Sequence, residues 1–336
     1  MRAASVTAAL SFALLTGCGH PQSMFAPGGP AADNLANLGW FVFILFIVVA
    51  AIMWVLLGWA AFRRRGTLEE HAPVDVGGGQ PWILIGGFAI PFVILAAVFV
   101  VGLDAMAEFP LEGPHETVPA DIRVTGHRWW WQVNYIKGQL DQQVTTANEI
   151  HIPVGRPVDI DLTSDDVIHS FFVPRIHGKV DLVPGQTNRI RIQANQPGVY
   201  RGQCAEYCGA QHAHMILLVV ADLPAQYDAW MARQIAPAEA PATEQQRRGE
   251  QLFLSKACVL CHTIRGTPAA ATVGPDLTHI AGRLGIASNM LPNTAGNLEA
   301  WVTHAQSLKP QAVMPDVNEF TGQQARDLVA YLQQLR

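Results

Sequence analysis

The sequence between positions 204 and 215 reads Cys204-Ala-Glu206-Tyr-Cys208-Gly-Ala-Gln-His212-Ala-His214-Met215, so two thiols, two imidazoles and a thioether fall within twelve residues. Soft sulfur ligands combined with imidazole favour copper over hard cations. A disulfide would leave the adjacent His and Met without a role, and zinc seldom uses a thioether. Copper chaperones also carry two Cys and a His, but usually in a thioredoxin-like α/β domain. We therefore interpret this stretch as a copper-binding loop.

One more imidazole is needed to complete such a site. The sequence offers His169 in the stretch Asp165-Asp166-Val-Ile-His169-Ser-Phe, and we choose it as that ligand. His214 lies two residues from His212, so in a strand it would point to the opposite face of the sheet. We therefore expect that His214 does not bind copper.

The sequence around the loop is strand-like. From position 119 to about position 222, short alternating apolar runs are separated by Pro and Gly, as in Ile150/Ile152/Val154, Val158/Ile160/Leu162 and Ile190/Ile192. The last strand is expected at 215–220, and a short helix around 226–233 precedes an Ala/Pro-rich linker. The pattern predicts an all-β sandwich or barrel over 119–222, joined by the segment 223–243 to a further domain.

A second motif, Cys258-Val-Leu-Cys261-His262, has the CxxCH pattern of covalent haem c attachment. In such a site the two thiols add to the haem vinyl groups, and the neighbouring imidazole binds the iron from one side. A zinc site would need further Cys or His at matching spacing, and only the scattered His279 and His304 remain. The motif therefore predicts haem c.

The second axial ligand of the haem is expected downstream. We favour Met314, in a Met-Pro loop similar to that of small cytochromes c, over Met290, which precedes Leu-Pro. A thioether raises the reduction potential relative to a second His. The stretch Gly274-Pro275-Asp276-Leu277 resembles the loop that supports the iron-binding His in small cytochromes c, which implies Pro275 as the backbone partner of His262.

The residues around the haem motif have a helical period. Thr243 with Gln246, and Thr321 with Gln324, form capping boxes ahead of apolar residues at helical spacing. We therefore predict that residues 244–336 form a small all-α domain. With the CxxCH motif and the Met-Pro loop, this domain resembles a class I cytochrome c.

The composition indicates a membrane protein. The 336 residues are 50% hydrophobic and only 15% charged, with a net charge of -5 and no basic stripe, which argues against nucleic acid as a partner. Residues 40–62 and 81–103 are two uncharged runs of 23 residues. At about 1.5 Å per residue, either run spans a hydrocarbon core of about 30 Å. We predict a multidomain membrane protein with a two-helix transmembrane hairpin.

The charges that flank the spans predict the topology. Arg63-Arg64-Arg65 follows the first span directly, so the positive-inside rule places the loop 63–80 in the cytoplasm. The segment 18–39 and the domains after position 103 then lie on the outer, periplasmic face of a bacterial plasma membrane.

The N-terminus predicts export. Residues 1–17 have the charge and apolar run of a secretory signal, and Leu15-Thr-Gly-Cys18 resembles a bacterial lipobox. The resemblance implies cleavage before Cys18 and lipid attachment to its sulfur, and a plain signal peptide with an incidental Cys is the alternative. Each of the five cysteines thereby has a role without a disulfide.

The copper-loop pattern, Cys-x-Glu-x-Cys-x3-His-x2-Met with Asp-x-x-His-Ser upstream, closely resembles the dinuclear CuA site of cytochrome c oxidase subunit II. With the fused cytochrome c domain, the chain resembles the caa-type oxidases over nearly its whole mature length. The resemblance implies a cupredoxin-like scaffold and the following copper ligands: Cys204 and Cys208 as bridging thiolates, His169 and His212 as terminal imidazoles, Met215 as a weak axial ligand, and the backbone carbonyl of Glu206. It also implies a magnesium ion near the Glu206 carboxylate, at the interface with subunit I.

The segment Gly126-His-Arg128-Trp129-Trp130-Trp131 resembles the aromatic segment through which electrons reach the copper in this family, with Trp129 at the receiving position. Arg128 and Trp130 depart from the usual Gln-Trp-Tyr-Trp pattern, and a packed aromatic strand is the alternative. The acidic residue that many relatives carry near the start of the second span, for proton uptake, is replaced here by Gln80, Trp82 and Leu84.

The resemblance implies an electron-input subunit of a respiratory cytochrome c oxidase. A soluble or membrane-bound cytochrome c would pass electrons through haem c and CuA to subunit I, where oxygen is reduced to water with coupled proton translocation. The chain alone should not reduce oxygen. The alternatives are a membrane copper carrier or electron-transfer module outside the oxidase, a quinol oxidase subunit II, which lacks the copper ligands, and a nitrous oxide reductase, whose domain order differs.

Overall fold

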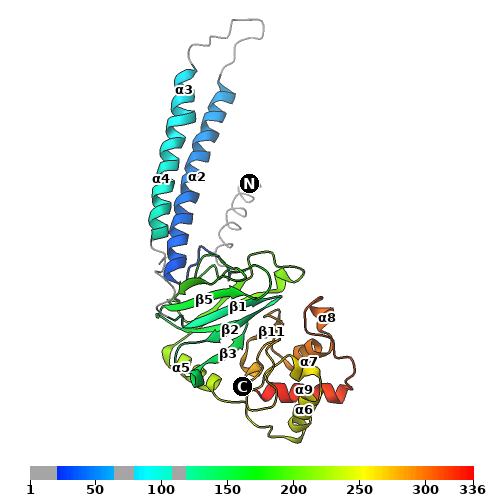
Figure 1. Cartoon of the computed structure of the whole chain (residues 1–336). Helices are drawn as coiled ribbons and strands as arrows, with labels where there is room; N and C mark the ends of the chain where they lie inside the picture. The colour runs from blue at the N-terminus through cyan, green and yellow to red at the C-terminus, as the bar shows by residue number, and fades with distance from the viewer. Residues whose placement is uncertain (1–20, 64–78, 108–118) are drawn as a thin grey trace, which may run out of the picture. The chain divides into compact units, whose positions relative to one another are not determined.

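The computed structural model describes residues 21–63, 79–107 and 119–336 (Figure 1). They form two compact units. One contains the apolar helices from Asp33 onward, and the other joins the residues before Asp33 to everything from position 119 to the C-terminus. The predicted signal and Cys18 lie outside the described residues, as does most of the loop 63–80.

The first unit consists of apolar helices. Helix α2 covers Pro30–Phe62, and a second helical run is made of α3 (Gln80–Leu84), a π-helical turn η2 (Ile85–Ala89) and α4 (Ile90–Ala107). Both runs are long and apolar enough to cross a membrane. Helix α2 begins ten residues before the apolar span expected from Trp40, because Pro30 and Asp33 suit a helical first turn. The Gly86-Gly87 pair lies in the π-helical turn, where such residues commonly interrupt a helix.

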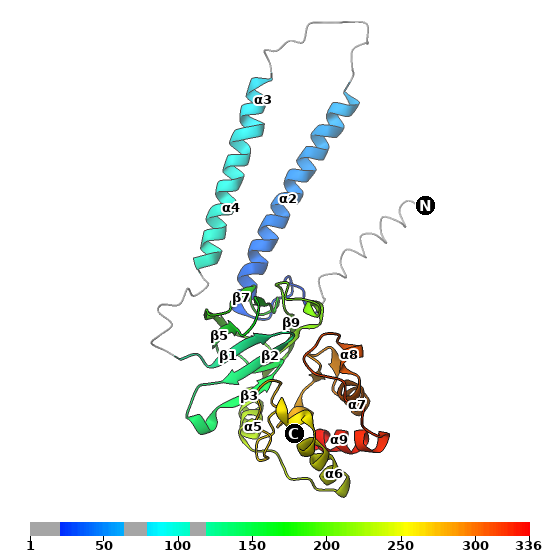
Figure 2. The same ribbon diagram turned by 45° about the vertical axis from the view of Figure 1, so that its right-hand side comes forward.

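The central domain is a β-sandwich of a five-stranded sheet, β3-β2-β1-β5-β8, and a three-stranded sheet, β4-β10-β9, with a two-stranded β6-β7 ribbon (Figures 1 and 2). Strands β1 and β5 pair in parallel, as do β4 and β10. The strands are β1 Ile122–His127, β2 Trp130–Tyr135, β3 Val144–Ala147, β4 Glu149–Pro153, β5 Val158–Ser164, β6 His169–Phe171, β7 Val180–Leu182, β8 Asn188–Ile192, β9 Gly198–Gln203 and β10 Ile216–Asp222.

The apolar runs of the sequence form the strands that build the core of this domain. Val124, Ile160 and Leu162 are completely or almost completely buried, and their polar neighbours along the strands are more exposed. A 3-10 turn, η3 (Leu140–Gln142), precedes β3, and helix α5 (Pro224–Ile235) follows the last strand. Trp230 of α5 stacks on the His151 ring at 4.1 Å between centroids, which attaches the helix to the sandwich.

The segment before α2 packs on the same sandwich. The amide of Gly28 donates to the carbonyl oxygen of Arg175 at 2.6 Å, and the amide of Asn195 donates to the carbonyl oxygen of Gly28 at 2.7 Å. Residues that precede the first apolar helix are therefore part of the domain that follows the second.

The C-terminal domain has a core of its own. Its elements are α6 Glu244–Ser255, η5 Ala257–Leu260, η6 Ile280–Gly282, β11 Gly285–Ile286, β12 Leu291–Pro292, α7 Ala295–Thr303, α8 Ala305–Leu308 and α9 Gly322–Gln334. Thr243 and Thr321 cap α6 and α9 through the predicted capping boxes. Phe253 of α6 and Tyr331 of α9 meet in the core, with their ring centroids 6.1 Å apart.

The prediction that this domain is all-α is wrong in one detail. Strands β11 and β12 pair through Ile286 and Leu291, and between them Ala287, Ser288 and Asn289 all have left-handed backbone. Periodicity could not indicate this turn, because a two-residue strand is too short to show a pattern.

Candidate metal centres

The predicted copper-binding loop connects β9 to β10 inside the sandwich. The amide of Cys204 donates to the carbonyl oxygen of Met215 at 2.9 Å, which closes the loop at its base. Cys204, Cys208 and Met215 are 1%, 4% and 0% exposed, and all three belong to the core of the domain. The sulfur atoms of the loop therefore face the protein interior.

The five predicted side-chain ligands come together at this point. The Sγ atoms of Cys204 and Cys208 are 3.8 Å apart. Nδ1 of His169 lies 3.9 Å from Sγ of Cys204, and Nδ1 of His212 lies 3.6 Å from Sγ of Cys208. Sδ of Met215 is 3.9 Å from Sγ of Cys208. Two thiols with two imidazoles and a thioether are a donor set that fits copper.

Contacts outside the loop orient His169, the first residue of β6. Its Nε2 lies 2.8 Å from Oδ1 of Asp166. A carboxylate at this position favours the proton on Nε2, which leaves the Nδ1 lone pair directed to the sulfur atoms. Gly126 provides the space, because a Cβ at this position would lie 2.7 Å from the imidazole Cδ2.

The contact between the two thiols shifts their pKa values in opposite directions. The hydrogen bond from Cys208, helped by His169, lowers the pKa of Cys204, while the same sulfur contact raises the pKa of Cys208. Burial lowers the pKa of His169, but its hydrogen bonds with Cys204 and Asp166 outweigh burial, so the net shift is upward. Cys204 therefore ionises first, and a metal that binds both thiols must displace the remaining proton.

Glu206 and His214 lie in different environments. The carbonyl oxygen of Glu206 is 3.1 Å from Sγ of Cys204, while its carboxylate is partly exposed and lies 3.2 Å from Nζ of Lys179. His214 belongs to a 3-10 turn, η4 (His212–His214), so the expectation that it lies in a strand is wrong. Its Nδ1 pairs with Oε1 of Gln211 at 2.7 Å.

Trp129 lies directly beside the copper-binding loop. The side chain is 7% exposed, and its indole Nε1 donates to the carbonyl oxygen of Cys208 at 2.9 Å. The ring therefore contacts the backbone of a predicted bridging cysteine and is covered from solvent.

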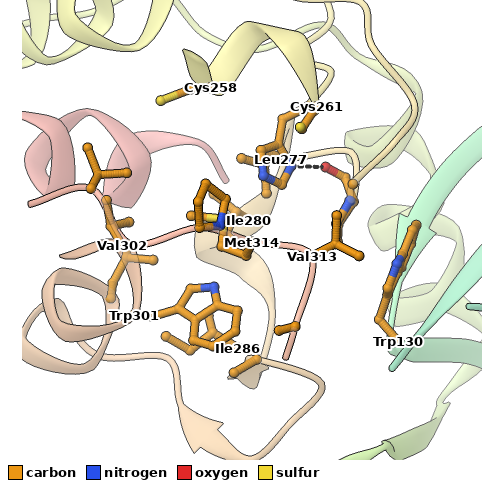
Figure 3. A pocket seen from close by; sticks show the side chains of 18 of the residues that line it. Trp130, Cys258, Cys261, Leu277, Ile280, Ile286, Trp301, Val302, Val313 and Met314 are labelled. Carbon is orange, nitrogen blue, oxygen red and sulfur yellow. Dashed lines mark hydrogen bonds between the residues drawn. The ribbon is translucent and has the colours of Figure 1, made fainter. Parts of the chain in front are cut away.

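The C-terminal domain contains an apolar pocket lined by the CxxCH motif (Figure 3). Cys258 and Cys261 lie along one side, and Trp301 and Ile286 lie along the opposite side. Nδ1 of His262 is 2.7 Å from the carbonyl oxygen of Pro275, the predicted partner. Burial lowers the pKa of His262, which favours the neutral imidazole that an iron atom needs.

Three features of this pocket fit a haem. Met314 lines it together with His262, whereas the rival Met290 is not among the lining residues. A Cβ at Gly274 would lie 2.8 Å from Cε1 of His262, so a glycine is needed beside the ring. Arg283 also lines the pocket, and among the described residues its buried Nε has no hydrogen-bond partner, which suits a haem carboxylate.

The β-sandwich supplies part of the wall of the same pocket. Trp130 of β2 lies at its edge, near Val313 of the methionine loop, and Asn148 also lines it. Lys309 and Glu149, both nearly buried, connect the two domains nearby. The roles of Lys309 and Glu149 could not be predicted from the sequence, because a lysine five positions before a predicted methionine ligand carries no signal of burial.

Comparison with known proteins assigns both domains. Residues 136–222 match the cytochrome c oxidase subunit II periplasmic domain family, and residues 246–336 match the cytochrome c family. Cytochrome c oxidase subunit 2 of Alkalihalophilus pseudofirmus is 36% identical over 96% of this chain and 94% of its own. The chain belongs to the cytochrome c oxidase subunit 2 family. It is therefore an electron-input subunit of a haem-copper oxidase, and it works in the oxidase complex with subunit I.

Two further matches are also described as subunits II of cytochrome oxidases. Cytochrome c oxidase subunit 2 of Bacillus sp. strain PS3 is 29% identical over 96% of this chain and 94% of its own. A solved structure of the periplasmic domain of subunit II of cytochrome oxidase from Bradyrhizobium japonicum is 25% identical and covers 36% of this chain and 96% of its own, with a TM-score of 0.33. Membership of the family implies CuA copper and haem c, and it makes this oxidase subunit membrane-bound.

Proposed function

We propose that this chain takes electrons from a c-type cytochrome, soluble or membrane-bound, and delivers them through its own two redox centres to subunit I. There oxygen is reduced to water with coupled proton translocation. Bound haem c and dinuclear copper each take up and release one electron at a time. The observation that supports this proposal most strongly is the cluster of two thiols, two imidazoles and a thioether in the core of the sandwich.

Each ligand has a proposed role. Cys204, Cys208, His169 and His212 would hold the copper ions through their sulfur and Nδ1 atoms, and Met215 and the Glu206 carbonyl would be weaker ligands. In the pocket, Cys258 and Cys261 would form the thioether links to haem c, and His262 and Met314 would hold its iron. The Pro275 carbonyl accepts the Nδ1–H of His262, so Nε2 is left for the iron.

Trp129 is proposed to receive electrons for the copper centre from the protein's own cytochrome domain. Its contact with the Cys208 carbonyl supports a path to the copper, and its burial separates it from a diffusing donor. An external cytochrome would then deliver its electron to the haem.

The membrane topology is part of the proposal. The hydrogen bonds between Gly28 and the sandwich support a hairpin, because the residues before the first span and after the second share one domain. The positive-inside rule places that domain in the periplasm, with Cys18 as its lipid anchor. The Glu206 carboxylate is proposed to lie near a magnesium ion at the interface with subunit I, in place of its present contact with Lys179.

Copper analysis of the full chain tests the function. We expect two copper ions per chain and, in the oxidised form, an EPR spectrum of one unpaired electron shared between two copper nuclei. A spectrum from a single copper, or copper that exchanges readily with a chelator, would contradict this function and favour a copper carrier with a fused cytochrome.

A further inference from the structure

The cytochrome domain is attached to the copper domain through buried polar contacts. Lys309 of the cytochrome domain is only 3% exposed, and its Nζ donates to three backbone carbonyl oxygens. Two belong to the copper domain, Trp129 at 2.8 Å and His214 at 3.1 Å. The third, Ala287 at 3.1 Å, belongs to its own domain. An ammonium group has three donors, so all of them are used, and two cross the domain boundary.

The carbonyl groups that Lys309 contacts are next to the predicted copper ligands. His214 lies between His212 and Met215, and the indole of Trp129 donates to the Cys208 carbonyl oxygen. Gln211 of the same loop also donates to the carbonyl oxygen of Pro310, at 3.0 Å. The copper-binding loop is therefore one of the surfaces on which the cytochrome domain docks.

The other end of the same segment reaches the haem pocket. Met314 follows Lys309 by five residues, and Nε2 of Gln306 donates to the carbonyl oxygens of Ala312 and Met314, each at 2.6 Å. The side-chain oxygen of Gln306 accepts from the amide of Gln311 at 3.0 Å. Gln306 thus bonds at three points to the loop that connects Lys309 to Met314.

In a second set of contacts, side chains of the copper domain accept hydrogen bonds from residues in and next to the β11–β12 turn. Glu149 is 2% exposed, and its Oε1 accepts from the amides of Leu284 at 2.6 Å and Gly285 at 3.2 Å. Oδ1 of Asn148 accepts from the Ser288 hydroxyl at 3.0 Å. These bonds hold a turn whose left-handed non-glycine residues are unfavourable by themselves.

We infer that Lys309 is a positioning residue that holds the cytochrome domain in one orientation on the copper-binding loop. Glu149 of the copper domain binds the cytochrome domain at a second point of the same contact. The cytochrome domain then stays docked during transfer between its haem and the copper, instead of swinging on the linker. This inference rests on the proposed function, because it assumes that both sites are loaded.

A buried ammonium is a costly way to join two domains, which supports a specific role. Burial lowers the pKa of Lys309 to about 7, so the ammonium form with its three donors predominates below neutral pH, and the three contacts of its Nζ are all to backbone carbonyl oxygens. Two apolar surfaces would associate without this cost, but in less defined positions. Directed bonds from one cation to three carbonyls set one orientation.

The test compares Lys309→Met with the wild-type full chain in the assembled, metal-loaded oxidase. Methionine keeps an unbranched side chain but removes the charge and all three donors. We expect amide hydrogen exchange to become at least about tenfold faster in peptides covering 211–218 and 284–291, because several charge-assisted bonds are lost. Exchange in α6 and α9 should be unchanged. Lys137→Met, at an exposed lysine of the copper domain, serves as the matched control.

Electron transfer gives the second readout. After flash reduction of the haem by a photoexcited ruthenium complex, one electron passes from the haem to the oxidised copper centre. In the wild type this rate should not depend on solvent viscosity. In Lys309→Met it should fall by about tenfold or more and become slower in glycerol, because re-docking then limits transfer. Glu149→Gln keeps an acceptor but loses the charge, so the same changes should be smaller.

Three results would overturn the positioning role of Lys309. The first is amide exchange at the domain contact that is unchanged in Lys309→Met. The second is faster exchange throughout the cytochrome domain of this variant, which would assign Lys309 to folding, and the third is a wild-type electron-transfer rate that already depends on viscosity. Failure of the proposed function would give a different result, namely a wild-type protein without the two-copper EPR spectrum. In that case, hydrogen exchange would still test whether Lys309 holds the two domains together.

Discussion

The two metal centres of this chain are built in different ways. In the copper domain, the sulfur and imidazole groups already touch one another, and Cys204, Cys208 and Met215 are members of one continuous apolar core. In the cytochrome domain, the predicted ligands line a pocket, and apolar side chains such as Ile280 and Val302 form its walls. The copper-binding loop is thus held by the fold around it, whereas a bound haem would form part of the core of the cytochrome domain.

This difference has a physical cause. Copper ions are small, so their ligands belong to a close-packed interior in which each neighbour restricts the next. A haem is a large apolar group, and the stability of its domain depends on the contacts that the pocket walls make with it. Removal of the haem should therefore lower the stability of the cytochrome domain more than removal of copper lowers the stability of the sandwich.

The strongest test of the comparison removes the haem attachment. Cys258→Ser combined with Cys261→Ser should abolish covalent haem and the cooperative thermal unfolding of the cytochrome domain, because its core loses a large apolar group. The copper EPR spectrum should persist. Pyridine haemochrome analysis and circular dichroism would measure both effects, and a double variant that melts like the wild type would refute the comparison.

Removing a copper ligand should give the reverse pattern. Cys208→Ser should abolish the two-copper EPR spectrum but leave the sandwich folded, at a cost of about 1–3 kcal/mol for a buried hydroxyl without its metal. Copper analysis and calorimetry of the metal-free proteins would test this. Loss of folding in the metal-free variant alone would mean that the loop, and not the surrounding core, organises the domain.

A change of axial ligand should alter the potential of the haem without unfolding its domain. Met314→His should lower the reduction potential by on the order of a hundred millivolts, because imidazole stabilises ferric iron more than a thioether does. Spectroelectrochemical titration would measure the shift. Met290→Leu is the matched control and should leave the potential unchanged, and the opposite result would identify Met290 as the ligand.

The smallest predicted effect concerns the attachment of α5 to the sandwich. Burial lowers the pKa of His151, but its hydrogen bonds with Asp222 and Glu149 outweigh burial and raise the pKa above its usual value. The folded state therefore binds this proton more tightly than the unfolded state does, so the stabilisation is present at low pH and is lost as the pH rises through the folded-state pKa.

His151→Gln should consequently lower the free energy of unfolding by about 1 kcal/mol more at about pH 6 than at about pH 9. Denaturant titrations at the two pH values would measure the difference. An equal cost at both values would show that the His151 contribution is stacking on Trp230 and not its charge.

Much of the fold could be predicted because its signals are local. The apolar runs at Ile150, Ile160 and Ile190 all lie in strands, and the capping boxes at Thr243 and Thr321 mark the starts of helices. The start of α2 and the β11–β12 turn were not predicted. A helix can extend past its apolar run when polar residues suit its first turn, and a two-residue strand has no period.

The candidate metal sites also divide into features with a local sequence signal and features without one. The sequence by itself determined the inventory of candidate ligands, because thiol, imidazole and thioether groups at close spacing restrict the choice of metal whatever surrounds them. The tertiary structure alone decided that Asp166 and Gly126 orient His169, that Trp129 is buried, and that Lys309 joins the haem segment to the copper-binding loop. These relations depend on burial and direction between residues far apart in the chain, and no local pattern of residues encodes them.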